Sequence, residues 1–92
     1  MAIGILVEVP GGTQEMYDRT MVELNLDAKP AQGLISHVAG PTESGWRVLD
    51  VWNTKADFEN FLNSRLGRAI HNAGFPGQPS ISEFPIHNSI RT

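Results

Sequence analysis

The sequence predicts an α+β fold in which one antiparallel sheet carries two helices on a single face. Three observations lead to this prediction. Two segments have the apolar periodicity of amphipathic helices, four shorter segments have strand-like composition, and Gly- and Pro-rich turns separate most of them. The resulting order is β-α-β-β-α-β, the ferredoxin-like arrangement of a four-stranded sheet. Right-handed crossovers place both helices on the same face of that sheet.

The first strand and the first helix occupy the N-terminal third of the chain. Residues 2–9, AIGILVEV, are rich in β-branched side chains and end at Pro10-Gly11-Gly12. The next segment, TQEMYDRTMVELNL, predicts an amphipathic helix with Thr13 as its N-cap. Tyr17 falls in the apolar sector of this helix, so its ring should be buried and its hydroxyl should need a partner.

Two further strands, residues 33–39 and 46–53, flank the turn sequence GPTESG and predict an antiparallel hairpin. If Gly40 pairs with Gly45 across a four-residue loop, His37 lies opposite Val48, and Asp50 is its diagonal neighbour on the same face. A loop with an odd number of residues would send His37 and Asp50 to opposite faces.

The second helix is expected within KADFENFLNSRLGRAIHNAG. Thr54 and Asp57 resemble a capping box at its start, and Gly74 is a natural C-cap. One side of this helix is apolar, with Phe58, Phe61, Leu62, Leu66, Ala69, Ile70 and Ala73. The last extended segment is residues 80–88, where Pro85 favours an edge or terminating strand.

Bulk properties narrow the classes of protein. Ninety-two residues suit one domain, residues 1–92. A net charge of -3 with seven scattered Lys and Arg argues against a nucleic-acid partner. The absence of cysteine fits a reducing compartment, and we expect a cytoplasmic protein. The N-terminal segment is typical of a strand rather than a signal peptide, and no apolar run approaches the ~20 residues of a membrane span.

Both faces of the predicted sheet are apolar. The first strand places Ile3, Ile5, Val7 and Val9 on one side, with Ala2 and Leu6 on the other. Two helices cover one face only, and an uncovered apolar face of this size is unusual for a monomer. We therefore expect a homodimer in which two sheets pack face to face or close into a barrel.

The His37 and Asp50 face also carries Trp46 and Trp52, which suggests a site for a small aromatic or carbonyl compound. His37 would act as general acid or base, Asp50 would fix its tautomer, Tyr17 would donate a proton, and the indoles would stack. No metal or cofactor is predicted, because the three histidines lie on separate elements and no phosphate-loop motif is present. The same residues also fit a purely structural His37-Asp50 hydrogen bond, and the sequence leaves open whether this face looks toward the helices or toward a second subunit.

The hairpin, the junction DVWNTKADFENF and the capped helix after it resemble the dimeric α+β barrel superfamily, and within it the antibiotic biosynthesis monooxygenase-like proteins. The resemblance implies a pocket between sheet and helices that includes Trp52, with Phe58, Phe61 and Leu62 on its helical side. It implies either a cofactor-free monooxygenase or an isomerase or cyclase, acting on an aromatic or polyketide-like compound.

The haem-degrading relatives have a histidine on the second helix, and this chain has none at the matching place. Those relatives and the quinone-forming monooxygenases carry an asparagine on the first strand, which this chain also lacks, so the resemblance to both groups is weaker here. Haem is therefore not expected. The alternative to an enzyme is a non-catalytic homodimeric ligand-binding or assembly protein.

Overall fold

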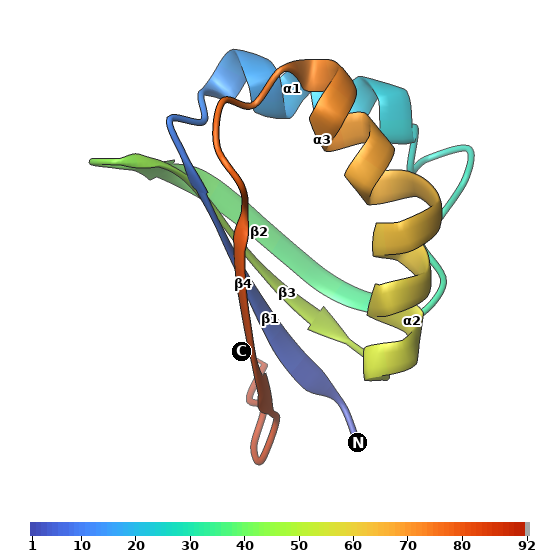
Figure 1. The fold of residues 1–92 in the computed structure, drawn as a ribbon. Coiled ribbons are helices and arrows are strands. Elements are labelled where there is room, and N and C mark those ends of the chain that lie inside the picture. The colour runs from blue at the N-terminus through green and yellow to red at the C-terminus, as the bar shows by residue number, and fades with distance from the viewer. Residues whose placement is uncertain (92) are drawn as a thin grey trace.

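The computed structural model describes residues 1–91, and within them the elements follow the predicted order. They are β1 (Ile3–Pro10), α1 (Gln14–Leu24), β2 (Leu34–Thr42), β3 (Gly45–Trp52), α2 (Lys55–Phe61), η1 (Leu62–Leu66), α3 (Gly67–Ala73) and β4 (Ser80–Pro85). The strands form one antiparallel sheet in the order β2-β3-β1-β4. Figure 1 shows all the helical segments on one face of the sheet. The predicted ferredoxin-like fold is confirmed.

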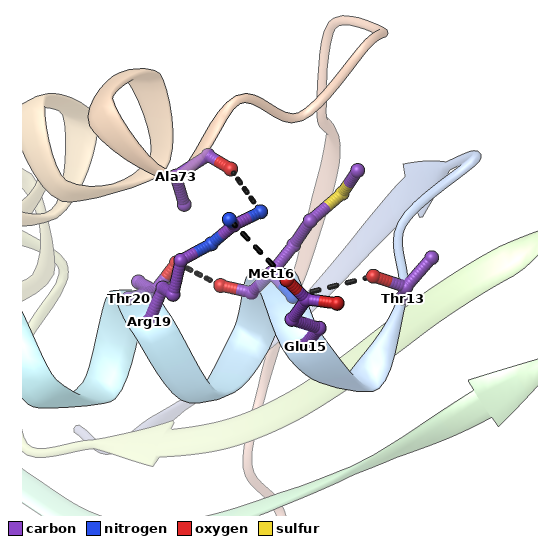
Figure 2. Close-up of polar contacts among 6 residues, drawn as sticks. All are labelled: Thr13, Glu15, Met16, Arg19, Thr20 and Ala73. Atoms are coloured by element: carbon purple, nitrogen blue, oxygen red, sulfur yellow. Dashed lines mark hydrogen bonds and ion pairs between the residues drawn. The ribbon is translucent and has the colours of Figure 1, made fainter.

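Helix α1 is fixed at both ends by the signals expected of a helix. The Oγ1 of Thr13 accepts a hydrogen bond from the backbone N–H of Met16 at 3.2 Å, so the predicted N-cap is confirmed (Figure 2). At the other end Asn25 adopts the left-handed conformation, with φ of 49°. Arg19 donates from Nη2 to the carbonyl of Ala73 at 3.1 Å, which ties α1 to the end of α3 (Figure 2).

The second helical segment lies where the sequence predicts it, but it is interrupted at its centre. It consists of α2, a π-helical turn η1, and α3. The N–H of Gly67 donates to the carbonyl of Leu62, five residues earlier, and a Cβ atom on Gly67 would lie 3.0 Å from that oxygen. Glycine therefore favours the wider turn, because any side chain would crowd the carbonyl oxygen. The predicted Thr54 cap and the Gly74 C-cap, with φ of 82°, are both confirmed.

The β2-β3 hairpin is tighter than predicted. Thr42 pairs with Gly45 across a loop of two residues, and Thr42 Oγ1 accepts from the Gly45 N–H at 3.1 Å. The expected pairing of Gly40 with Gly45 is wrong; Gly40 lies within β2 opposite Arg47. Shortening the loop by two residues keeps the side chains on their predicted faces. His37 consequently lies directly opposite Asp50 rather than diagonal to it.

The two faces of the sheet differ sharply in burial. The helix-covered face holds most of the core, including Ile5 of β1 and Trp52 of β3, both fully buried. The opposite face leaves Val38 62% exposed and Phe84 50% exposed. In Figure 1 no element lies against this second face. Among residues 1–91, no helix has the length and apolar character needed to cross a membrane.

Candidate functional site

Four side chains from three elements form a continuous polar chain beneath the helices. His37 of β2 contacts Asp50 of β3 through Nδ1 and Oδ1 at 2.6 Å. Its other nitrogen, Nε2, contacts the hydroxyl of Tyr17 of α1 at 2.6 Å. Trp52, two residues after Asp50 on the same strand face, donates from Nε1 to Asp50 Oδ2 at 3.2 Å. The strand register and the packing of α1 therefore bring together residues as far apart in the sequence as Tyr17 and Trp52.

The hydrogen-bonding properties of these four groups determine which group donates and which accepts in each contact. An indole nitrogen only donates, so Asp50 Oδ2 must accept from Trp52. In the arrangement with a carboxylate at Asp50 and a neutral imidazole at His37, Asp50 Oδ1 also accepts, and the His37 proton is on Nδ1. His37 Nε2 is then an acceptor, and the Tyr17 hydroxyl donates to it. The four groups thus run from the Trp52 indole through the Asp50 carboxylate and the His37 imidazole to the Tyr17 hydroxyl.

Burial affects the two acidic groups among these side chains, the Asp50 carboxylate and the Tyr17 hydroxyl. Asp50 is 6% exposed, and a buried carboxylate is costly unless it is hydrogen-bonded. Both of its oxygens have partners, one in His37 and one in Trp52. Burial raises the pKa of the Tyr17 hydroxyl above its usual value of 10.0, and the negative charges of Asp50 and then Asp18 raise this pKa further. Tyr17 is therefore a neutral phenol at physiological pH.

A partly open cavity of about 60 Å³ lies beside these four side chains. Tyr17, His37 and Asp50 contribute to its wall, and the other lining residues, Thr20 apart, are apolar or aromatic: Val7, Val9, Met21, Leu24, Leu26, Leu34, Trp46, Val48, Trp52, Phe61, Leu66, Ile70 and Phe75. This volume is smaller than the roughly 150 Å³ of an engineered apolar cavity that holds benzene. In this conformation the cavity would hold only a few heavy atoms.

The face that carries His37 and Asp50 looks toward the helices, which resolves the alternative left open by the sequence. Of the residues expected to bind substrate, Trp46, Trp52 and Phe61 line the cavity. Phe58 lies behind Trp52, with its ring edge-on to the indole and centroids 5.7 Å apart. Leu62 lines a separate surface groove near α3. Phe58 and Leu62 are thus not part of the cavity wall.

Two features of the tryptophans were not anticipated from the sequence. Trp52 was expected to stack on a ligand, but its indole N–H holds Asp50. The i, i+2 spacing on one strand face is the signal that could have indicated this contact. Trp46 lies against Tyr17 with ring centroids 5.2 Å apart, and its buried Nε1 has no hydrogen-bond partner among residues 1–91. Within the same residues, no cluster of three His, Cys, Asp or Glu side chains could hold a metal ion.

Comparison with known proteins identifies the fold. No family model matches the sequence, and no curated protein matches it. Among solved structures, the NE2512 protein of unknown function from Nitrosomonas europaea has a TM-score of 0.74 and 16% identity, over 99% of this chain and 94% of that chain. A "putative antibiotic biosynthesis monooxygenase" from Caulobacter crescentus has a TM-score of 0.70 and 13% identity, over 95% and 91% of the two chains.

A third structure is SnoaB from Streptomyces nogalater, described as a cofactor-independent oxygenase and solved as its N63A mutant. It has a TM-score of 0.66 and 10% identity, over 99% of this chain and 97% of that chain. Other matching structures are described as dimeric ferredoxin-like proteins. At these identities the likeness concerns the fold. The predicted resemblance in fold to putative antibiotic biosynthesis monooxygenases and to dimeric ferredoxin-like proteins is confirmed.

Proposed function

We propose that this protein is a small-molecule enzyme that moves a proton to or from a substrate bound between the sheet and helix α1. The observation that carries the proposal is the unbroken chain from buried Asp50 through His37 to the Tyr17 hydroxyl, at the wall of an apolar cavity. Acid-base catalysis needs a proton acceptor within hydrogen-bond reach and a group that orients it. His37 and Asp50 meet both requirements.

The direction of the chain suggests how the proton moves. A substrate hydroxyl that contacts the Tyr17 oxygen would give its proton to Tyr17, while Tyr17 gives its own proton to His37 Nε2. The resulting imidazolium would be stabilised by the Asp50 carboxylate. Because the pKa of Tyr17 is raised, Tyr17 would pass a proton on rather than remain as a phenolate.

Two reaction types use this proton transfer, and the hydrogen-bonded side chains of Tyr17, His37 and Asp50 are compatible with both. In an isomerase or cyclase, the substrate anion is reprotonated or closes a ring. In a cofactor-free monooxygenase, the anion itself gives an electron to dioxygen; a CH₂ group becomes C=O and the second oxygen atom leaves as water. The description of SnoaB as a cofactor-independent oxygenase supports the second type. The cavity of about 60 Å³ favours a compact substrate over a large polyketide-like one, and an aromatic ring would fit only if the cavity widened.

Turnover of small phenols and enolisable ketones, with dissolved oxygen and product mass measured together, tests the proposal. Product formed with oxygen consumption indicates the monooxygenase, and product without it indicates the isomerase or cyclase. His37→Asn and Tyr17→Phe should each lower kcat/KM at least about a hundredfold, since positioned proton transfer contributes roughly 10² to 10⁴. Unchanged turnover in both variants would refute the proton-transfer role.

The alternative is a non-catalytic ligand-binding or assembly protein in which the His37-Asp50 pair is structural. The observation in its favour is that every polar group of the chain already has a partner within the protein. This alternative predicts that His37→Asn lowers the melting temperature and leaves ligand affinity unchanged. It also predicts that no candidate substrate is turned over.

We also propose that the protein acts as a homodimer in the cytoplasm. The exposed apolar residues Val38, Leu49 and Phe84 on the uncovered sheet face support a second copy there. The dimeric ferredoxin-like proteins with the same fold lend further support. The cytoplasmic location is supported by the absence of cysteine in the 92 residues.

A further inference from the structure

The cavity beside Tyr17 and His37 is smaller than the usual site for a small molecule. Its volume is about 60 Å³, whereas such sites usually measure roughly 300–1,000 Å³. Only the head of a substrate, a few heavy atoms, would lie in the cavity. The rest of the substrate needs space that continues from the cavity.

A surface groove of about 420 Å³ lies on the other side of one cavity wall. Ile70 of α3 and Phe75 of the loop between α3 and β4 line both hollows, so their side chains form the wall between them. The other side chains of the groove are Leu62, His71, Gln78, Pro79 and Ile81. The polar His71 and Gln78 are exposed, whereas Leu62 and Pro79 are half-buried. The floor of the groove is therefore apolar.

A second hollow, of about 430 Å³, shares Met21 and Leu26 with the cavity. All of its lining residues belong to the end of α1 and the loop that follows, within residues 21–27. The groove, in contrast, has two walls, α3 on one side and the start of β4 on the other. A molecule that extends out of the cavity would bury more surface in the groove than in the hollow at α1.

Phe75 is the less constrained part of the wall between cavity and groove. Ile70 is held within α3, whereas Phe75 lies on a loop, directly after Gly74 with its φ of 82°. A Cβ atom on Gly74 would meet no atom within 4 Å, so the space beside this residue is open. Loops move more readily than the elements they join. A rotation of the Phe75 side chain would join the cavity to the groove.

We propose that the groove is the second part of the substrate site and takes an unbranched aliphatic tail, while a hydroxyl- or carbonyl-bearing head lies in the cavity beside Tyr17 and His37. The inference rests on the proposed function and names its substrate class. An unbranched chain has a smaller cross-section than a ring, so it needs the smallest displacement of Phe75. Burial of its CH₂ groups against the apolar floor of the groove favours binding.

Straight-chain primary alcohols from 1-butanol to 1-octanol test the inference. Each CH₂ group buried in the groove should raise the affinity roughly threefold to fourfold, so the affinity should keep rising up to octanol. Binding is followed by the ¹H–¹⁵N amide signals of the intact protein. Octanol should move the signals of Gly77 and Ile81, which line the groove, and leave that of Val38 on the uncovered sheet face unchanged.

Ile81→Trp should block the groove. Ile81 is 42% exposed on the edge strand β4, so a larger side chain there would occupy the groove without displacing the core. Octanol should then bind about as weakly as butanol, and the affinity for butanol should change less than twofold. Ile90→Trp is the matched control, because Ile90 is 78% exposed and is not among the residues that line the groove.

Phe75→Leu tests the shared wall. A smaller side chain there should raise the association rate of octanol and leave that of butanol unchanged, because the cavity is partly open and butanol does not need to cross the wall. Equal association rates of octanol in the wild type and in Phe75→Leu would argue against entry of the tail past Phe75.

Three results would overturn the inference: an affinity that stops rising beyond butanol, an equal loss for butanol and octanol in Ile81→Trp, or octanol shifts confined to the uncovered sheet face. None of these results bears on His37 and Tyr17 as proton carriers. Loss of turnover of short substrates in His37→Asn and Tyr17→Phe would still support the proposed function.

Discussion

Asp50 is the residue on which the polar chain depends. It is a buried carboxylate between a donor that cannot accept, Trp52, and a histidine whose proton it fixes. The sequence was sufficient to predict that His37 and Asp50 share a face, because side-chain alternation in a strand preserves parity when a loop changes by two residues. The role of Trp52 was not predictable in the same way. A buried indole can stack or donate with equal ease, and only the final geometry distinguishes these roles.

Trp52→Phe should disconnect one oxygen of Asp50 while retaining an aromatic ring against Phe58 and Phe61. Hydrogen bonds to charged groups contribute about 1.5–3 kcal/mol, and we expect a loss of that order in the free energy of unfolding. Histidine ¹⁵N chemical shifts should also show His37 losing its preference for the Nδ1-protonated tautomer. Phe61→Leu, which removes a ring against Trp52 but no donor, is the control. A tautomer that is unchanged in Trp52→Phe would contradict the orienting role of Trp52.

Tyr17 predicts a pH dependence of stability at the alkaline end. Its pKa is raised in the folded state, from 10.0, so the folded protein binds this proton more tightly than the unfolded chain. Its contribution to stability is fully present below the unfolded pKa and falls as pH rises from there through the folded pKa. Urea unfolding between pH 8 and 11 should show the wild type losing stability more steeply than Tyr17→Phe. Parallel curves above pH 10 would contradict this assignment.

The elements show where local sequence rules succeed and where they are overridden. Thr13, Thr54 and Gly74 carry capping signals that act within one turn, and each is found where predicted. The π-turn η1 escaped prediction because apolar periodicity reports which side of a helix is buried and is insensitive to one extra residue per turn. Arg65, within that turn, also donates to the carbonyls of Leu24, Lys29 and Pro30, contacts that no local pattern encodes.

Gly67→Ala tests the π-turn. Replacing glycine by alanine in an ordinary helix stabilises it by about 1 kcal/mol. Here the new methyl group would meet the Leu62 carbonyl at 3.0 Å, so we expect the gain to vanish or reverse to a loss of about 1 kcal/mol. Gly40→Ala is the matched control, because no atom lies within 4 Å of its added methyl group and β2 should be unchanged or slightly stabilised. Thermal unfolding of both variants measures the two effects, and a stabilised Gly67→Ala would argue against crowding of the Leu62 carbonyl by the new methyl group.

At the scale of the whole molecule, helices cover one face of the sheet and leave the other face uncovered. The helix face buries the core, the cavity and the polar chain. The other face exposes Val38, Leu49 and Phe84, which a monomer of this size would leave in water. Apolar residues on both sides of the first strand predicted an uncovered apolar face from the sequence. The cavity could not be predicted, because its volume depends on how closely α1 approaches the sheet rather than on any residue pattern.

A charge placed on the uncovered face should therefore separate the proposed homodimer without disturbing the site. Leu49→Glu would bury a carboxylate in an apolar interface, which is costly without a partner, so the variant should sediment as a monomer at concentrations where the wild type is a dimer. Val22→Glu is the control, because Val22 is 79% exposed on α1 and lies away from that face. Sedimentation equilibrium gives the oligomeric state, and the Trp46 and Trp52 indole signals report whether the cavity is intact. A wild type that stays monomeric when its concentration is raised about 100-fold would contradict a dimer through this face. A Leu49→Glu variant that remains dimeric would place the subunit contact elsewhere.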